Sequence, residues 1–252
     1  MVGMSPGRGQ GWIRHSSTAP FSRDTDDVNA EAYAAVRARV AVVVLEGNPE
    51  MPVPACPGWR VRDVVAHLAG LCEDWVDHRL DSYASEKWTD AQISRSSGET
   101  LEQVLERWRM AAERFAQLED DPVMGSPSRW AFGDAITHEA DIRGALQAGR
   151  VPSDAVLLSL KGSVARWRET LRDASAPTLL LQAPDARGWW LGVRDDPMAV
   201  VAEAPAYEFF RALSGRRSSS QVRMWKWSGN PDLFLDIGLP YPFHWADGDV
   251  LD

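Results

Sequence analysis

Four amphipathic segments before residue 150 constrain the fold of this chain more than any other feature. They span residues 28–47, 60–80, 99–120 and 128–149. In the second segment Val61, Val64 and Leu68 recur every three or four residues, which places them on one face of a helix. Gly47 and Gly149 follow the first and last segments as helix stop signals. Such helices bury their apolar faces against one another, so the pattern predicts a four-helix bundle.

The chain changes character after residue 150. A fifth helical segment over 153–173 is followed by strand-like stretches over 177–205, which proline, aspartate and glycine interrupt. A helix over 206–218 and an irregular stretch over 221–243 come next. We therefore expect an α+β fold. Its predicted parts are a flexible tail at 1–27, a four-helix bundle at 28–150 and a smaller C-terminal α/β domain at 151–252.

Composition excludes several classes of partner. The net charge of −9 argues against a nucleic-acid-binding or anionic-membrane surface. No apolar run approaches the roughly 20 residues that span a bilayer. Cys56 and Cys72 are the two cysteines of the chain, so a disulfide framework is not expected and a reducing cytoplasm is the simplest location. The composition leaves open whether the protein is a monomer or a homodimer.

A polar stripe on the segment at 128–149 is the strongest functional signal. Asp134, His138 and Asp141 share one helix face, because steps of four and three residues return to nearly the same direction. Asp134 and His138 are one turn apart and can converge on one ion. His67, at the edge of the apolar stripe of the second segment, is the candidate third ligand. Two imidazoles and a carboxylate suit Zn²⁺ and leave a fourth position open for chemistry.

Simpler interpretations of these residues stand beside the metal site. An Asp/His pair at helical spacing also fits a solvated ion pair, and His67 also fits a hydrogen-bonded histidine at the edge of a core. Asp141 either orients His138 from behind or is an exposed acid. Cys56 is a weak candidate nucleophile, because its flanking prolines favour a structural turn and no nearby base is evident.

Three segments resemble a known family in their order along the chain. "VPACPGWRVRDVVAHLAG" at 53–70 is similar to the signature that opens the second helix of the mycothiol-dependent maleylpyruvate isomerases, which are DinB-like metalloenzymes. "DAITHEAD" at 134–141 resembles their second signature, in which Glu usually takes the first position. "EFFRALSGRRSSSQVRMWKWSGNPDLFL" at 208–235 resembles a C-terminal segment common in actinobacterial members.

The resemblance implies a ligand set and a cosubstrate. By analogy, His67, Asp134 and His138 hold a divalent metal, usually zinc, and mycothiol is the thiol cosubstrate. The resemblance also implies a cleft arginine at Arg216, although a helix-terminal cation is an alternative role and Arg217 competes for either role. Asp134 is one methylene shorter than the usual Glu, which leaves open whether it binds directly, through water or not at all.

The sequence thus favours a metal-dependent enzyme that uses a low-molecular-weight thiol, with a small electrophilic molecule as substrate. Arg216 would contact substrate or cosubstrate, and Asp141 would support the same site. Isomerisation and S-transfer both fit this chemistry. The alternatives are a non-catalytic ligand-binding protein and a metal enzyme that activates water or another thiol. We expect the loop at 81–100 and the C-terminal tryptophans to shape the pocket, for a substrate that the sequence does not identify.

Overall fold

The computed structural model describes residues 30–119 and 127–251 and consists of a helical half and a mixed α/β half. The predicted tail at 1–27 lies outside the described residues. The helices of the first half are α1 (Ala30–Glu46), α2 (Val61–Val76), α3 (Glu86–Arg95), α4 (Leu101–Phe115) and α5 (Pro127–Leu146). The predicted bundle helices α1, α2, α4 and α5 are all present, and the α+β fold class is confirmed.

Helix α2 lies at the centre of the helical half. It packs against α3, α4 and α5, and α1 packs against α5. Twelve of its residues are buried, including Val61, Val64 and Leu68 of the predicted apolar stripe. His67 and Asp74 are buried on the same helix, so polar groups of α2 also lie inside the helical half.

The sequence suggested a loop at 81–100, but this segment is partly helical. It contains α3, whose N-terminus is capped by the hydroxyl of Ser85, an acceptor for the backbone N–H of Trp88. Few residues of this segment are apolar, but Trp88 and Gln92 are one turn apart and both are buried. Packing of these two side chains against the bundle holds the helix in place.

The second half is built on a four-stranded mixed sheet of strand order β2-β1-β3-β4. The elements after α5 are α6 (Ser153–Asp173), β1 (Leu179–Gln182), β2 (Trp189–Leu191), β3 (Val200–Glu203), α7 (Ala206–Leu213), α8 (Ser219–Arg223), β4 (Lys226–Trp227) and α9 (Asp232–Leu235). β1 pairs in parallel with β3 and antiparallel with β2. The stretch at 221–243, expected to be irregular, contains β4 and α9, which are too short to leave a clear periodicity in the sequence.

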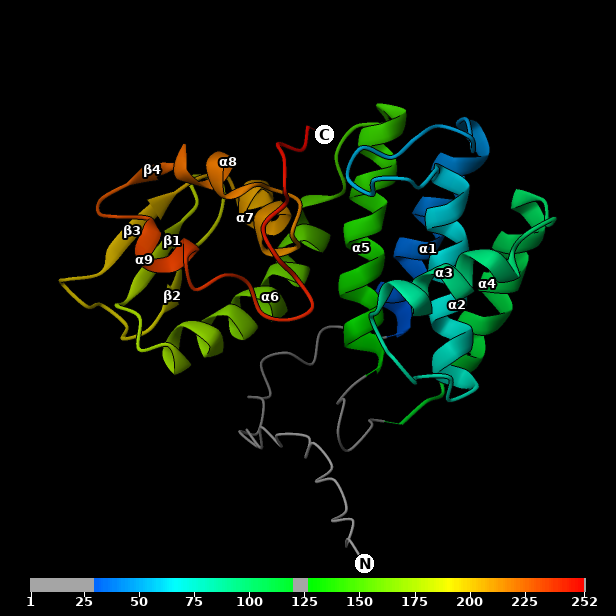
Figure 1. Cartoon of the computed structure of the whole chain (residues 1–252), viewed down its shortest axis with the longest axis horizontal. Helices are drawn as coiled ribbons and strands as arrows, with labels where there is room; N and C mark the ends of the chain where they lie inside the picture. Colours follow the sequence, from blue (N-terminus) through cyan, green and yellow to red (C-terminus); the bar gives the residue numbers. More distant parts are fainter. Residues whose placement is uncertain (1–29, 120–126, 252) are drawn as a thin grey trace, which may run out of the picture.

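Helix α6 joins the two halves, because it contacts α5 on one side and α7 and β2 on the other (Figure 1). One hydrophobic cluster extends from Tyr33 on α1 to Phe234 on α9, so the core is continuous across residue 150. The division into domains at residue 150 stays a prediction. Among the described residues, no helix is both long enough and apolar enough to cross a membrane.

Candidate metal centre

Three side chains converge where α2 faces α5. The Nε2 atom of His67 lies 3.3 Å from Asp134 Oδ2, and the Nε2 atom of His138 lies 3.7 Å from Asp134 Oδ1. The Oδ2 atom of Asp134 is buried and makes no hydrogen bond to the described residues. A buried carboxylate oxygen without a hydrogen bond, faced by two imidazole nitrogens, fits the donor set that zinc takes. The three predicted ligands therefore lie together, and their role as ligands stays a prediction.

The carboxylate of Asp134 and the two imidazoles shift one another's pKa values. Burial alone would raise the pKa of Asp134, but the imidazoles of His138 and His67 outweigh it and hold that pKa below its ordinary value. Burial alone would lower the pKa of His67, but Asp134 outweighs it and the pKa is raised. The carboxylate therefore stays ionised between the two rings, which is the state in which it binds a cation.

A buried chain of hydrogen bonds fixes the far side of His67. The Nδ1 atom of His67 lies 2.6 Å from Gln92 Oε1, and Gln92 Nε2 donates to Asp74 Oδ2 at 2.8 Å. The amide nitrogen of Gln92 is thus engaged by a carboxylate, so its oxygen faces the imidazole and Nδ1 must carry the proton. The lone pair of His67 is left on Nε2, which faces Asp134. Asp74 also accepts from Arg79 and Arg95.

Sequence reasoning missed Gln92. The one available signal was the spacing of Trp88 and Gln92, which puts an indole and an amide on one face of a short helix. Nothing local in the sequence shows that this face meets α2.

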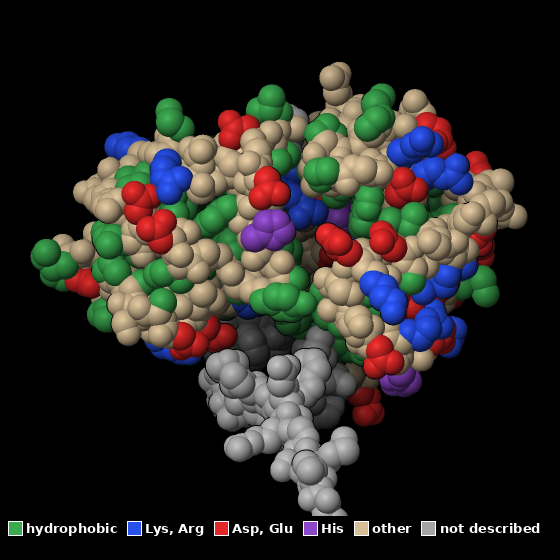
Figure 2. All heavy atoms as spheres, in the orientation of Figure 1, with side chains coloured by type: hydrophobic (Ala, Val, Ile, Leu, Met, Phe, Trp, Pro, Cys, Tyr) green, Lys and Arg blue, Asp and Glu red, His purple; other side chains and the backbone are tan. Residues whose placement is uncertain are grey.

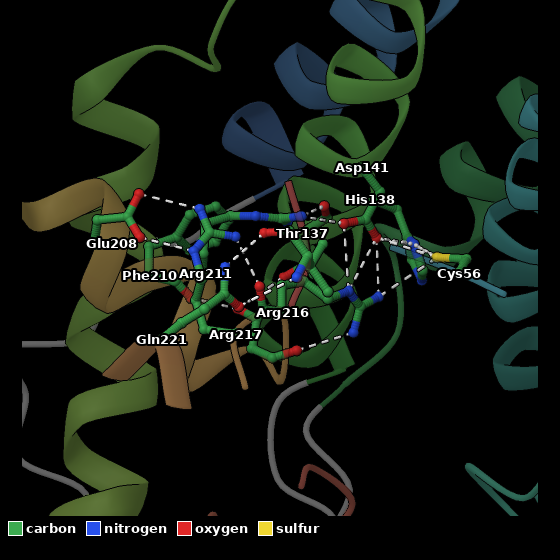
Figure 3. A network of polar contacts seen from close by, with 12 residues as sticks. Cys56, Thr137, His138, Asp141, Glu208, Phe210, Arg211, Arg216, Arg217 and Gln221 are labelled. Carbon is green, nitrogen blue, oxygen red and sulfur yellow. Dashed lines mark hydrogen bonds and ion pairs between the residues drawn. The ribbon is translucent and has the colours of Figure 1, made fainter. Parts of the chain in front are cut away.

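A carboxylate fixes the far side of His138. Asp141 Oδ2 lies 3.0 Å from His138 Nδ1, as the interpretation of Asp141 as an orienting group expects. Both carboxylate oxygens are also paired with arginines from the second half, at 2.8 Å to Arg211 and 2.9 Å to Arg216 (Figure 3). Burial alone would raise the pKa of Asp141, but Arg216 and Arg211 hold it well below its ordinary value.

The two neighbouring arginines after Gly215 have different partners. Arg216 pairs with Asp141, and its Nη1 donates to the carbonyl of Ser214 at the end of α7. Its position fits both roles that the sequence left open, a cleft arginine and a helix-terminal cation, and its role at the site stays a prediction. Arg217 pairs with Glu208 at 2.7 Å. Figure 3 shows the two guanidinium groups on opposite sides of this network.

Cys56 lies closer to the site than the sequence indicated. Its Sγ donates to Asp141 Oδ2 at 3.4 Å and lies 3.8 Å from both His138 Nδ1 and Arg216 Nη2. The statement that no base lies near Cys56 is therefore wrong, because the fold brings α5 to the turn that contains it. Burial raises the pKa of the thiol, Asp141 raises it further, and Arg216 opposes this only in part. The thiol stays protonated, which disfavours a nucleophilic role.

Aromatic rings border the candidate ligands. The Trp59 ring stacks on His138 at 6.1 Å between centroids and is tilted against His67 at 5.3 Å. Trp88 meets His67 edge-on at 6.4 Å, and the ring of Tyr83 lies 4.9 Å from that of Trp88. Figure 2 shows a hollow between the two halves, in which basic, acidic and histidine side chains gather.

Comparison with known family models gives a match for the helical half of the chain. Residues 30–143 match the family described as "Mycothiol maleylpyruvate isomerase N-terminal domain". The match spans α1 to α5, so the helical half of the chain is similar to that domain family. No sequence among the curated proteins matches the chain.

Two solved structures share the fold beyond the matched domain. One is a crystal structure of the mycothiol-dependent maleylpyruvate isomerase, with 14% identity and a TM-score of 0.53. The other is a histidine-to-alanine mutant of that enzyme, with 13% identity and the same TM-score. Each alignment covers 81% of this chain and 95% of the other, so both halves are included. At this identity the likeness establishes the arrangement of helices and sheet, and function depends on the site.

Proposed function

We propose that the protein is a zinc-dependent enzyme that uses mycothiol to act on a small electrophilic molecule, by isomerisation or S-transfer. The observation that carries the proposal is the Asp134 carboxylate, which is faced by His67 and His138 and whose buried Oδ2 has no hydrogen bond within the described part of the chain. The family of residues 30–143 supports mycothiol as the thiol, and the two free cysteines suit a cytoplasmic enzyme.

Each side chain of the site has a separate role in this proposal. His67, Asp134 and His138 would hold the zinc ion, which lowers the pKa of a bound thiol and so supplies the thiolate nucleophile. Gln92 and Asp141 keep the two imidazoles in the orientation and tautomer that leave each Nε2 toward Asp134. Arg216 would stabilise negative charge that develops on the substrate. Addition of a thiol to a double bond allows rotation about the resulting single bond, and its elimination completes an isomerisation.

Metal analysis of purified variants tests the proposal. We expect about one zinc per chain in the wild type, in line with one closed set of three ligands. His67→Ala and His138→Ala should lose the metal. His244→Ala is the matched control, because it removes an exposed histidine and should keep the metal. Unchanged zinc content in both ligand variants would contradict the proposal.

A turnover assay separates an enzyme from a binding protein on the same scaffold. Maleylpyruvate with mycothiol is the first pair to supply, because the matched family is named after both. Turnover that a chelator abolishes excludes a non-catalytic role. Turnover that persists with water or another thiol in place of mycothiol would favour the alternative of a different metal-activated nucleophile.

A further inference from the structure

Arg166 on α6 is a half-buried cation that has no ion pair with any residue that the structure describes. Its guanidinium carbon lies 4.8 Å from the ring centroid of Trp130 on α5 and 5.2 Å from that of Phe243 in the C-terminal segment. The Nη1 atom is buried and has no hydrogen-bond partner, and the structure records no ion pair of Arg166 with any described residue. The residue as a whole is half-buried.

Two sets of contacts connect this cation to the candidate metal centre. Trp130 precedes Asp134 by four residues on α5, so its side chain is on the same helix face, about 6 Å along the axis. A second connection consists of aromatic contacts: the ring of His67 meets that of Trp88, which in turn meets that of Tyr83. Tyr83 is within electrostatic range of both ends: burial raises its pKa, Asp134 raises it further, and Arg166 lowers it.

Arg216 and Arg166 differ in the group that already faces each guanidinium. Arg216 already faces a buried carboxylate, Asp141, whereas Arg166 faces rings. Burial lowers the pKa of Arg166, with only a weak opposing effect from Tyr83, because no carboxylate compensates for its lost hydration. An arginine remains charged even so, and a buried charge without a counterion is costly unless an anion joins it.

We propose that Arg166 anchors a carboxylate of the substrate, while Trp130 and Phe243 cover the apolar or unsaturated carbons next to that carboxylate. The inference rests on the proposed function in calling this ligand the substrate, and it adds the residue of this chain that holds the substrate's carboxylate. The planar fork of arginine matches a carboxylate in a bidentate geometry, and aromatic faces hold both the guanidinium and an unsaturated ligand.

Binding of two probes by the full chain tests the inference. The probes are maleate, a dianion, and maleamide, its neutral diamide of similar shape, measured by isothermal titration calorimetry. Arg166→Gln should weaken maleate binding by about 10- to 100-fold, the effect of losing a hydrogen bond to a charged group, and leave maleamide binding unchanged. Arg172→Gln is the matched control, since it removes an exposed charge from the same helix and should leave both affinities unchanged.

Two further measurements keep the inference falsifiable if Arg166→Gln folds poorly. Arg166→Lys keeps the charge but loses the fork, so it should retain part of the maleate affinity. A crystal structure of the wild type with maleate should show carboxylate oxygens within hydrogen-bond distance of Arg166. A carboxylate bound elsewhere, or no maleate binding by the wild type, overturns the inference. So does an Arg166→Gln variant with a lower melting temperature and unchanged maleate affinity, because Arg166 would then only join the two halves.

These experiments need neither zinc nor mycothiol, so the two proposals can fail separately. If maleate binds through Arg166 in a protein without thiol-dependent turnover, the enzyme proposal fails and the anion site stands. If turnover depends on zinc and mycothiol while Arg166→Gln leaves maleate affinity unchanged, the anchor is wrong and the enzyme proposal stands.

Discussion

At the scale of single residues, the two histidines of the candidate site are held by different chemistry. His67 is backed by the neutral amide of Gln92, whereas His138 is backed by the carboxylate of Asp141. The carboxylate of Asp141 also pairs with two arginines, and their positive charges compensate its negative charge near the imidazole of His138. Both arrangements point Nε2 toward Asp134. Two independent supports for the same orientation are what a metal site requires.

The amide behind His67 gives the first prediction. Gln92→Leu removes the acceptor that fixes the tautomer of His67, so zinc affinity should fall by about 10- to 100-fold, as for other groups behind a metal ligand. Competition with a chromophoric chelator measures the affinity. The melting temperature of the metal-free variant is the control, because general unfolding would lower it as well. Zinc affinity equal to that of the wild type would contradict this role for Gln92.

Asp134 gives the second prediction, since it differs from the residue usual in the resembling family. Its two oxygens already face the two imidazoles, so Asp134→Asn should lower zinc affinity by more than about tenfold through loss of the anionic ligand. Asp134→Glu restores the charge and should bind more tightly than the Asn variant. Equal zinc affinity of the Asn variant and the wild type, measured by the same competition, would remove Asp134 from the ligand set.

The sequence could predict this site in part. Residues on one helix face, such as Asp134, His138 and Asp141, follow from periodicity alone. The apolar stripe of the second segment indicated His67, and the family resemblance supplied Arg216. Cys56 and Gln92 could not be found in this way. Their positions depend on how a proline-rich turn and a short helix fold back onto the bundle, and such long-range contacts leave no local pattern.

At the scale of elements, α3 shows how packing overrides a weak local signal. The helix approaches α2 at Gly70, where an added Cβ atom would lie 2.6 Å from the Cβ atom of Gln92. Only a glycine allows that separation without a shift of one helix. The close approach is also what brings the Gln92 amide within reach of His67.

Gly70→Ala therefore gives the third prediction. The new methyl group must push α3 away, which should lower the free energy of unfolding by about 1–3 kcal/mol, as overpacking does, and weaken zinc binding. Gly162→Ala is the matched control, because an added Cβ atom there meets nothing within 4 Å. It should raise the free energy of unfolding by about 0.5–1 kcal/mol through helix propensity. Urea denaturation measures both; equal effects of the two substitutions would contradict the close approach.

At the scale of the whole molecule, the candidate metal centre and the junction between the halves share a residue. Asp141 supports His138 on α5 and pairs with Arg211 on α7 and Arg216 after it. The Asp141 and Arg211 side chains have 0% exposure, so this pair is inside the continuous core. The arrangement predicts that a change at the junction alters both stability and the metal site.

Asp141→Asn gives the fourth prediction. The substitution keeps the shape of the side chain but leaves two guanidinium groups without their carboxylate, one of them fully buried. Breaking a buried pair in this way costs about 3–5 kcal/mol, so the free energy of unfolding in urea should fall by that amount. Glu106→Gln is the control, because it removes an exposed partner of Arg109 and should leave the transition unchanged. Because one core spans both halves, far-UV circular dichroism and tryptophan fluorescence should report the same transition midpoint in the wild type. A loss below about 1 kcal/mol, within the range of an exposed pair, would mean that Asp141 does not hold the halves together.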